Sequence, residues 1–181
     1  MAGLDPPLGT TVMSLQIDPT YPHAGLWKHP QGTSLTVTYL SLEEGIQETS
    51  SPNYSDVEIT GRAEAYKIYS GTSNKEIQLS FHFQGTDRNS VKEDVIYPAR
   101  FLDALKYPLT SGNLSYPPPP CLLKIGTLLM ARVVVTSADI TWEAPFDVKT
   151  MEPHSASVPV TFTIVQKVNT DLAYDFDGVF Q

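Results

Sequence analysis

Hydrophobic residues alternate with polar ones in several separate segments, and this alternation predicts a chain built mainly of β-strands. The clearest case is Glu76–Gln84, where Ile77, Leu79, Phe81 and Phe83 alternate with polar residues. Residues two apart share one face of a strand, so the pattern predicts a strand with one buried face. Less regular alternation predicts further strands at Val12–Ile17, Thr33–Leu42, Asp56–Tyr69, Cys121–Ile125, Thr127–Glu143 and Val158–Lys167.

One short helix is predicted between Asp94 and Tyr107, where apolar residues recur at helical spacing. Pro98 suits its first turn, because the missing N–H is not needed there, and Pro108 ends it. Polar residues, glycines and prolines between these elements predict loops at Glu43–Ser55, Ser70–Asn74, Thr110–Pro120 and Ala144–Ser157.

The last two predicted strands are expected to pair as a long antiparallel hairpin, because they follow each other across one loop. At least six strands and one helix predict a mainly β fold. We expect a β-sandwich or an open barrel, with the helix covering one opening.

Three parts of the chain differ in composition. Residues 1–32 are rich in proline, glycine, threonine and histidine, which predicts an extended N-terminal arm. Tyr21 and Trp27 are costly to leave in water, so this arm is expected to dock on its own domain or on a neighbouring subunit. Residues 33–168 form the predicted β domain. Residues 169–181 are acidic and aromatic, and we expect this tail to fold on a partner.

Charge narrows the classes of partner. The 181 residues include 12 Lys and Arg against 20 Asp and Glu, a formal net charge of -8. This balance argues against a nucleic-acid binder that neutralises phosphates. The excess acid lies near the two ends of the chain, where it favours either a solvated surface or the repulsion of a passing polyanion. No secretory signal or membrane span is visible, so a soluble protein made in a cytoplasm is expected.

Few residues suggest chemistry. The four histidines lack the spacing of a metal site and are interpreted as surface residues, while Cys121 is interpreted as a small buried apolar residue. Asp175 and Asp177 match a calcium loop only loosely. The four prolines 117–120 fit a stiff spacer better than a recognition ligand. We therefore predict no enzyme activity, no cofactor and no metal.

The segment from Ala99 to Lys167 carries a more specific signal. Its order is Ala-Arg-Phe-Leu-Asp-Ala-Leu-Lys-Tyr-Pro, a loop, Pro-Pro-Pro-Pro-Cys-Leu-Leu-Lys-Ile-Gly, then Val-Val-Val-Thr-Ser-Ala-Asp-Ile-Thr-Trp, and finally Ser-Val-Pro-Val-Thr-Phe-Thr-Ile-Val. This order resembles the tube-like baseplate proteins of contractile-tailed bacteriophages. The likeness lies in a helix ending in Tyr-Pro, a proline-led strand and a long hairpin with a tryptophan.

The resemblance implies a tail-tube-like fold in a structural virion protein of a phage tail baseplate. Copies would assemble side by side into a ring, with six as the expected number, or into a mixed ring with related tube-like proteins. Neighbouring strands would form a barrel around a channel through which DNA passes. The ring would join the central hub to the tail tube, so hub and tube proteins are the expected partners.

The resemblance and the aromatic ends together suggest which residues meet neighbouring subunits. The expected assembly residues are Tyr21, Trp27, Val133, Val135, Trp142, Phe146, Val160, Phe162, Tyr174, Phe176 and Phe180. A second hypothesis is a β-sandwich module of the same virion that binds a glycan or a peptide through surface aromatics.

Overall fold

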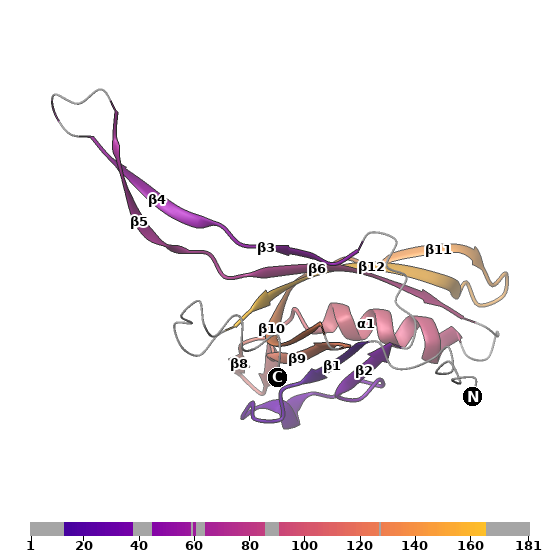
Figure 1. The fold of residues 1–181 in the computed structure, drawn as a ribbon. Helices are drawn as coiled ribbons and strands as arrows, with labels where there is room; N and C mark the ends of the chain where they lie inside the picture. The colour runs from indigo at the N-terminus through magenta and orange to yellow at the C-terminus, as the bar shows by residue number, and fades with distance from the viewer. Residues whose placement is uncertain are drawn as a thin grey trace, which may run out of the picture.

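A computed structural model describes residues 13–37, 45–58, 60, 64–85, 91–126 and 128–165. These residues form antiparallel sheets and one short helix, which confirms the predicted mainly β fold (Figure 1). The strands are β1 Met13–Ile17, β2 Ser34–Val37, β3 Gln47–Thr49, β4 Pro52–Val57, β5 Tyr66–Thr72, β6 Glu76–Gln84, β7 Leu109–Ser111, β8 Leu114–Tyr116, β9 Cys121–Ile125, β10 Leu129–Ala138, β11 Thr141–Phe146 and β12 Pro153–Ile164.

Eight strands make one bent sheet that forms the body of the molecule. Its order is β2-β1-β9-β10-β12-β6-β3, and β11 also pairs with β12. Figure 1 shows β6, β11 and β12 on one side of the helix and β1, β2 and β9 on the other. Bending lets one sheet supply both layers of a core, which corresponds to the open form of a barrel.

The helix fills the space between these two layers. A π-helical turn at Lys92–Ile96 leads into α1, Tyr97–Ala104, so the helical segment begins slightly before the predicted start. Pro98 lies in the first turn of α1, as predicted. Just before it, the N–H of Tyr97 bonds to the carbonyl of Lys92, five residues back. Proline donates no such bond, so a wider turn precedes it at little cost.

The core follows the alternation in the sequence. The four apolar residues of β6 are all buried, and Phe101 and Leu102 of α1 are fully buried opposite the sheet. Burying such large side chains contributes about 1.5 to 3 kcal/mol each. The strand that alternates most regularly in the sequence therefore lies over the centre of the core.

The long hairpin is confirmed. β10 and β11 pair in turn with β12, so that Val133 lies opposite Ile164 and Thr141 opposite Ser157. The register between β10 and β12 shifts by one residue beside Thr136, and this shift is a β-bulge. The expected loop Ala144–Ser157 is shorter than predicted, because β12 begins at Pro153 and its first half pairs with both β11 and β6.

The prediction of one strand over Asp56–Tyr69 was wrong. The region forms two strands, β4 and β5, which pair only with each other. β3 and most of β4 lie in the expected loop Glu43–Ser55, and β5 extends into the expected loop Ser70–Asn74. These strands have no buried face, so the sequence lacks the alternation that would have revealed them. The expected loop Thr110–Pro120 likewise contains a small hairpin, β7–β8.

Residues 13–32 pack onto the body. β1 is an inner strand between β2 and β9. The hydroxyl of Tyr21 donates to the carbonyl of Pro117 at 2.9 Å. The ring of Trp27 packs edge-on against Phe101, and its indole N–H donates to the carbonyl of Gly32 at 2.7 Å. This part of the expected arm thus docks on its own domain.

Candidate assembly surfaces

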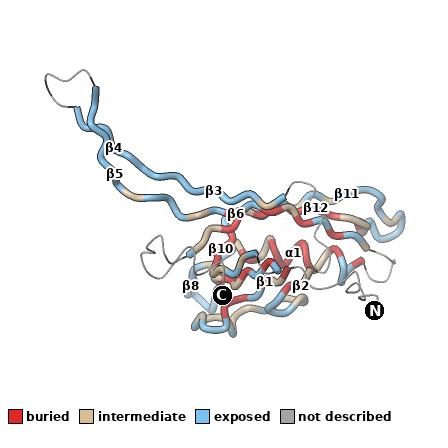
Figure 2. The backbone as a smooth tube through the Cα atoms, viewed as in Figure 1, coloured by how far each residue is buried: buried red, intermediate tan, exposed pale blue. Residues whose placement is uncertain are grey.

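A hairpin of β4 and β5, here called the arm, projects far from the body (Figure 1). It continues the direction of β3 and β6, so the main sheet extends into it. Figure 2 shows it exposed along its length, and Gly71 is the only residue of β4 or β5 that is not fully in the exposed class. The arm therefore contributes nothing to the core.

The two faces of the arm differ in chemistry. One face carries Tyr54 against Tyr69, with ring centroids 5.7 Å apart, and an ion pair of 3.5 Å between Lys67 and Asp56. The other face carries three apolar side chains that are about half exposed: Val57, Tyr66 and Ile68. A two-stranded ribbon cannot bury either face by itself and is marginally stable in water. Both faces of the arm are thus uncovered within the described part of the chain.

The main sheet has open edges. β3 pairs with β6 only as far as Gln78, and among the described residues no strand lies beside the rest of that edge of β6. Within the same residues, the outer edges of β2 and β11 also have no partner strand. Open edges present unpaired N–H and C=O groups that can pair with another chain.

The turn between β11 and β12 lies at the opposite end of the body from the arm (Figure 1). We call the segment from Phe146 to Glu152 the apolar turn. A carboxylate oxygen of Asp147 accepts from the backbone N–H of Lys149 at 2.7 Å and of Thr150 at 3.2 Å. These bonds hold the turn in one shape.

This held turn presents apolar side chains to water. Val148 is 92% exposed, Met151 is 70% exposed and Phe146 is 41% exposed. Met151 also has a φ of 55°, a left-handed conformation that is uncommon for a residue other than glycine. Backbone strain of this kind often accompanies a functional surface.

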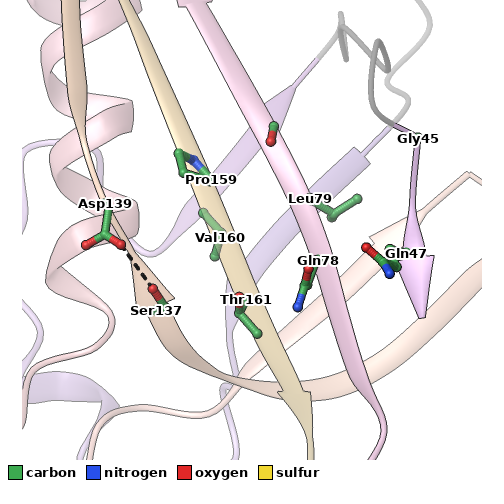
Figure 3. A pocket seen from close by; sticks show the side chains of 10 residues that line it. Gly45, Gln47, Gln78, Leu79, Ser137, Asp139, Pro159, Val160 and Thr161 are labelled. Atoms are coloured by element: carbon green, nitrogen blue, oxygen red, sulfur yellow. Dashed lines mark hydrogen bonds between the residues drawn. The ribbon is translucent and has the colours of Figure 1, made fainter. Parts of the chain in front are cut away.

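A shallow pocket lies at the base of the arm (Figure 3). Gln47 and Gln78 line one side of the pocket. Ser137 and Asp139 line the other side, where the hydroxyl of Ser137 donates a hydrogen bond of 3.3 Å to the carboxylate of Asp139. Asp139 is the only titratable side chain of the lining. Acid–base catalysis needs a second group beside the first, and a single exposed carboxylate does not make such a pair. The polar side chains of this lining can still form hydrogen bonds at the surface.

The structure separates the expected assembly residues into three groups. Val133, Val135, Val160 and Phe162 are buried in the chain's own core, so they shape the long hairpin and do not reach a neighbour in this conformation. Tyr21, Trp27 and Trp142 are half-buried, and Phe146 is exposed. The expected tail residues, Tyr174, Phe176 and Phe180, lie outside the described residues.

The sequence analysis missed the arm and most of the apolar turn. The signal that could have found the arm is the group of tyrosines and β-branched residues on both sides of a charged segment, which is typical of strands. The apolar turn could have been suspected from two large apolar residues, Val148 and Met151, in a stretch that was otherwise interpreted as loop.

The side chains considered for chemistry have ordinary surroundings. Cys121 is buried, as predicted, and burial raises the pKa of its thiol to about 12. His29 packs beside Phe101, and burial, with Arg100 nearby, lowers the pKa of its imidazole. No group of three metal-ligating side chains occurs among the described residues. In that same part of the chain, no helix is long and apolar enough to cross a membrane.

Neither of two comparisons with known proteins gives a relative. No protein-family model matches the sequence, and no curated protein is significantly similar to it.

Proposed function

We propose that this protein is a structural subunit of a phage tail baseplate, and that it assembles into a ring between the central hub and the tail tube. Assembly would use strand pairing and packing of exposed β surfaces, without chemistry. The observation that carries the proposal is the arm, a β-hairpin that leaves the body and has no packing partner within its own described chain.

Three further features support assembly. Among the residues that the structure describes, the main sheet has open edges, and ring closure is a common way to remove such edges. The long hairpin β10–β11–β12 and the helix before it are the elements that carry the resemblance to tube-like baseplate proteins. The net charge of -8 is multiplied in a ring, and an acidic assembly lets DNA pass without adsorbing.

Electron microscopy of the purified protein tests this proposal, alone and mixed with the tube and hub proteins of the same particle. We expect annular particles with a central hole, in at least one of these preparations. Light scattering coupled to size exclusion would give the number of subunits. A monomer in every mixture, together with no binding to either partner, would contradict the proposal.

One observation favours a second candidate, a glycan- or peptide-binding module of the virion. Three tyrosines of the arm, Tyr54, Tyr66 and Tyr69, are each more than half exposed, and aromatic rings of this kind stack on sugars and peptides. A glycan array separates the two candidates. Binding that is lost when these tyrosines are replaced by serine would favour the module.

A further inference from the structure

The connection between β1 and β2 packs two rings against the helix. We call this connection, residues 18–33, the strap (Figure 1). The ring of Trp27 meets Phe101 of α1 edge-on, with centroids 5.6 Å apart, and the imidazole of His29 meets the same ring edge-on at 5.7 Å. Phe101 is fully buried, while Trp27 and His29 are half-buried. The strap therefore covers one side of a core residue of the helix.

The hydrogen bonds of this part of the strap are centred on His29. The backbone N–H of Gln31 donates to Nδ1 of the imidazole at 3.1 Å, and the N–H of Gly32 donates to the carbonyl of His29 at 2.9 Å. The indole N–H of Trp27 in turn donates to the carbonyl of Gly32 at 2.7 Å. The place of Trp27 over the helix thus depends on the turn that His29 closes.

Protonation of His29 would break the side-chain bond of this turn. A backbone N–H can donate to Nδ1 only when that nitrogen carries no proton, so the imidazole in the closed strap is neutral, with its proton on Nε2. A proton taken up from water binds at Nδ1 and leaves two N–H groups facing each other. Water can satisfy both groups only if the turn opens, and leaving them unsatisfied is costly.

The surroundings of His29 also disfavour its charged form. Burial, and the positive charge of Arg100 on α1, both lower the pKa of the imidazole from the ordinary value of 6.5. In an open strap the imidazole lies in water, so the open form binds the proton more readily than the closed form. Closure of the strap is therefore most favourable above pH 6.5 and is lost progressively as the pH falls below that value.

The carboxylates on the elements around His29 are bound to other cations. Asp103 of α1 lies 2.6 Å from the ammonium of Lys106, and Asp18, at the start of the strap, lies 2.6 Å from the guanidinium of Arg132. None of the other titratable residues in the described parts of the strap, α1 and β8 is a carboxylate, so none supplies an anion that would stabilise an imidazolium. These residues are Tyr21, His23, Lys28, Tyr97 and Tyr116.

We propose that the strap is a pH-sensitive latch. Uptake of one proton by His29 opens the turn at residues 29–32 and frees Trp27 from the helix. β1 and β2 keep their places, because their hydrogen-bond ladders do not involve the turn. The acidic form then presents Phe101 as part of an aromatic surface that the neutral form covers. This inference concerns the single subunit and does not depend on the proposed ring.

Tryptophan fluorescence tests the latch. The chain has two tryptophans, so Trp142→Phe leaves Trp27 as the reporter. Lowering the pH from about 8 to about 4 covers the titration of a histidine with a lowered pKa. We expect the emission to shift to longer wavelength, with a midpoint below pH 6.5. Far-ultraviolet circular dichroism should stay constant across this shift, because the sheets remain folded.

Two neutral substitutions in the reporter protein decide whether His29 is the group that titrates. His29→Asn places an amide oxygen near the position of Nδ1, where it can accept from Gln31 at every pH, so the emission should not shift. His29→Gln is also neutral but carries its oxygen further out, so the strap should be looser and equally insensitive to pH. His82→Asn, at an exposed histidine of β6, is the matched control and should keep the full shift.

Hydrogen exchange gives a second readout that needs no substitution. In the unaltered protein, amides of residues 24–33 should exchange faster as the pH falls through the same range, after correction for the intrinsic pH dependence of exchange. Amides of β1 and β9 should stay protected, because these strands are paired with each other. Constant protection of residues 24–33 would overturn the inference.

Three fluorescence results would also overturn it. A shift with an unchanged midpoint in either His29 variant that folds would assign the transition to another group. A loss of circular dichroism together with the shift would mean that the whole subunit unfolds. An emission that does not move in the Trp142→Phe protein would mean that the strap stays closed while the histidines titrate.

Discussion

At the scale of single residues, the ion pair between Asp18 and Arg132 connects two parts of the main sheet. Asp18 is 3% exposed, and its carboxylate lies 2.6 Å from the guanidinium of Arg132 on β10. The second carboxylate oxygen accepts from the backbone N–H of Thr20 at 2.8 Å and from its hydroxyl at 2.7 Å. The residue that follows β1 is thereby joined to β10 across β9, which lies between these strands.

We predict that Asp18→Ala lowers the free energy of unfolding by about 2 to 3 kcal/mol. The substitution leaves a largely buried guanidinium without its carboxylate, and removing one partner of a buried pair is costly. Urea denaturation followed by circular dichroism measures the change. Asp56→Ala breaks the exposed pair with Lys67 on the arm and serves as the matched control, with an expected loss below about 1 kcal/mol. Equal losses in the two variants would contradict this account.

At the scale of elements, the arm differs from the strands of the body that cover the helix. The strands of the body have alternating buried and exposed residues where they cover the helix, whereas β4 has no buried residue at all. The free energy that holds the body together therefore arises from the bent sheet and α1. The arm depends on its own ladder of hydrogen bonds and on cross-strand pairs.

We predict that the arm can be removed without unfolding the body. Thr49 lies opposite Glu76, so replacing residues 51–74 with Asn-Gly leaves Ser50 and Lys75 on either side of a two-residue turn. The melting temperature should change little, because no core residue is lost. Size exclusion should show that the excised variant no longer assembles. A large drop in melting temperature would mean that the arm stabilises its own body.

At the scale of the whole molecule, the free energy of local opening is expected to be high in the body and low in the arm. Hydrogen exchange reports the free energy of opening for each amide. We predict that amides in β6, β10 and β12 exchange slowest in the isolated subunit, because these strands cover the fully buried core. Amides of β4 and β5 should exchange much faster, through local opening. In the assembled state the arm amides should become protected, and unchanged exchange there would argue that the arm stays free.

Much of the body could be predicted from the sequence, because burial leaves a regular pattern in the chain. β6 and β9 were predicted with the bounds that the structure gives them, and Phe81 and Cys121 are buried as their surroundings suggested. The helix was expected to end at the Tyr107–Pro108 step, but α1 ends at Ala104, and only turn hydrogen bonds continue to Tyr107. These features depend on local spacing, which a single sequence shows.

The candidate surfaces were harder to predict. Val133 and Phe162 were chosen as assembly residues because the resemblance implies that their hairpin meets neighbouring subunits, but both are buried in the chain's own core. β-Branched and aromatic residues favour a strand in either setting. A residue's environment depends on what lies across from it, and the register of long-range pairs decides that. The arm was missed because neither of its faces is buried, so burial imposes no two-residue period on its sequence.

The sequence by itself determined that this chain is mainly β, that one short helix precedes a long hairpin, and which side chains are apolar enough to be buried. Local propensity and the two-residue period of strands are sufficient for these conclusions. Only the tertiary structure decided that β1 lies inside the sheet, that β4 and β5 leave it as an arm, and that the apolar turn lies at the far end. These arrangements arise from pairings between residues distant in the chain, and neither propensity nor spacing specifies such partners.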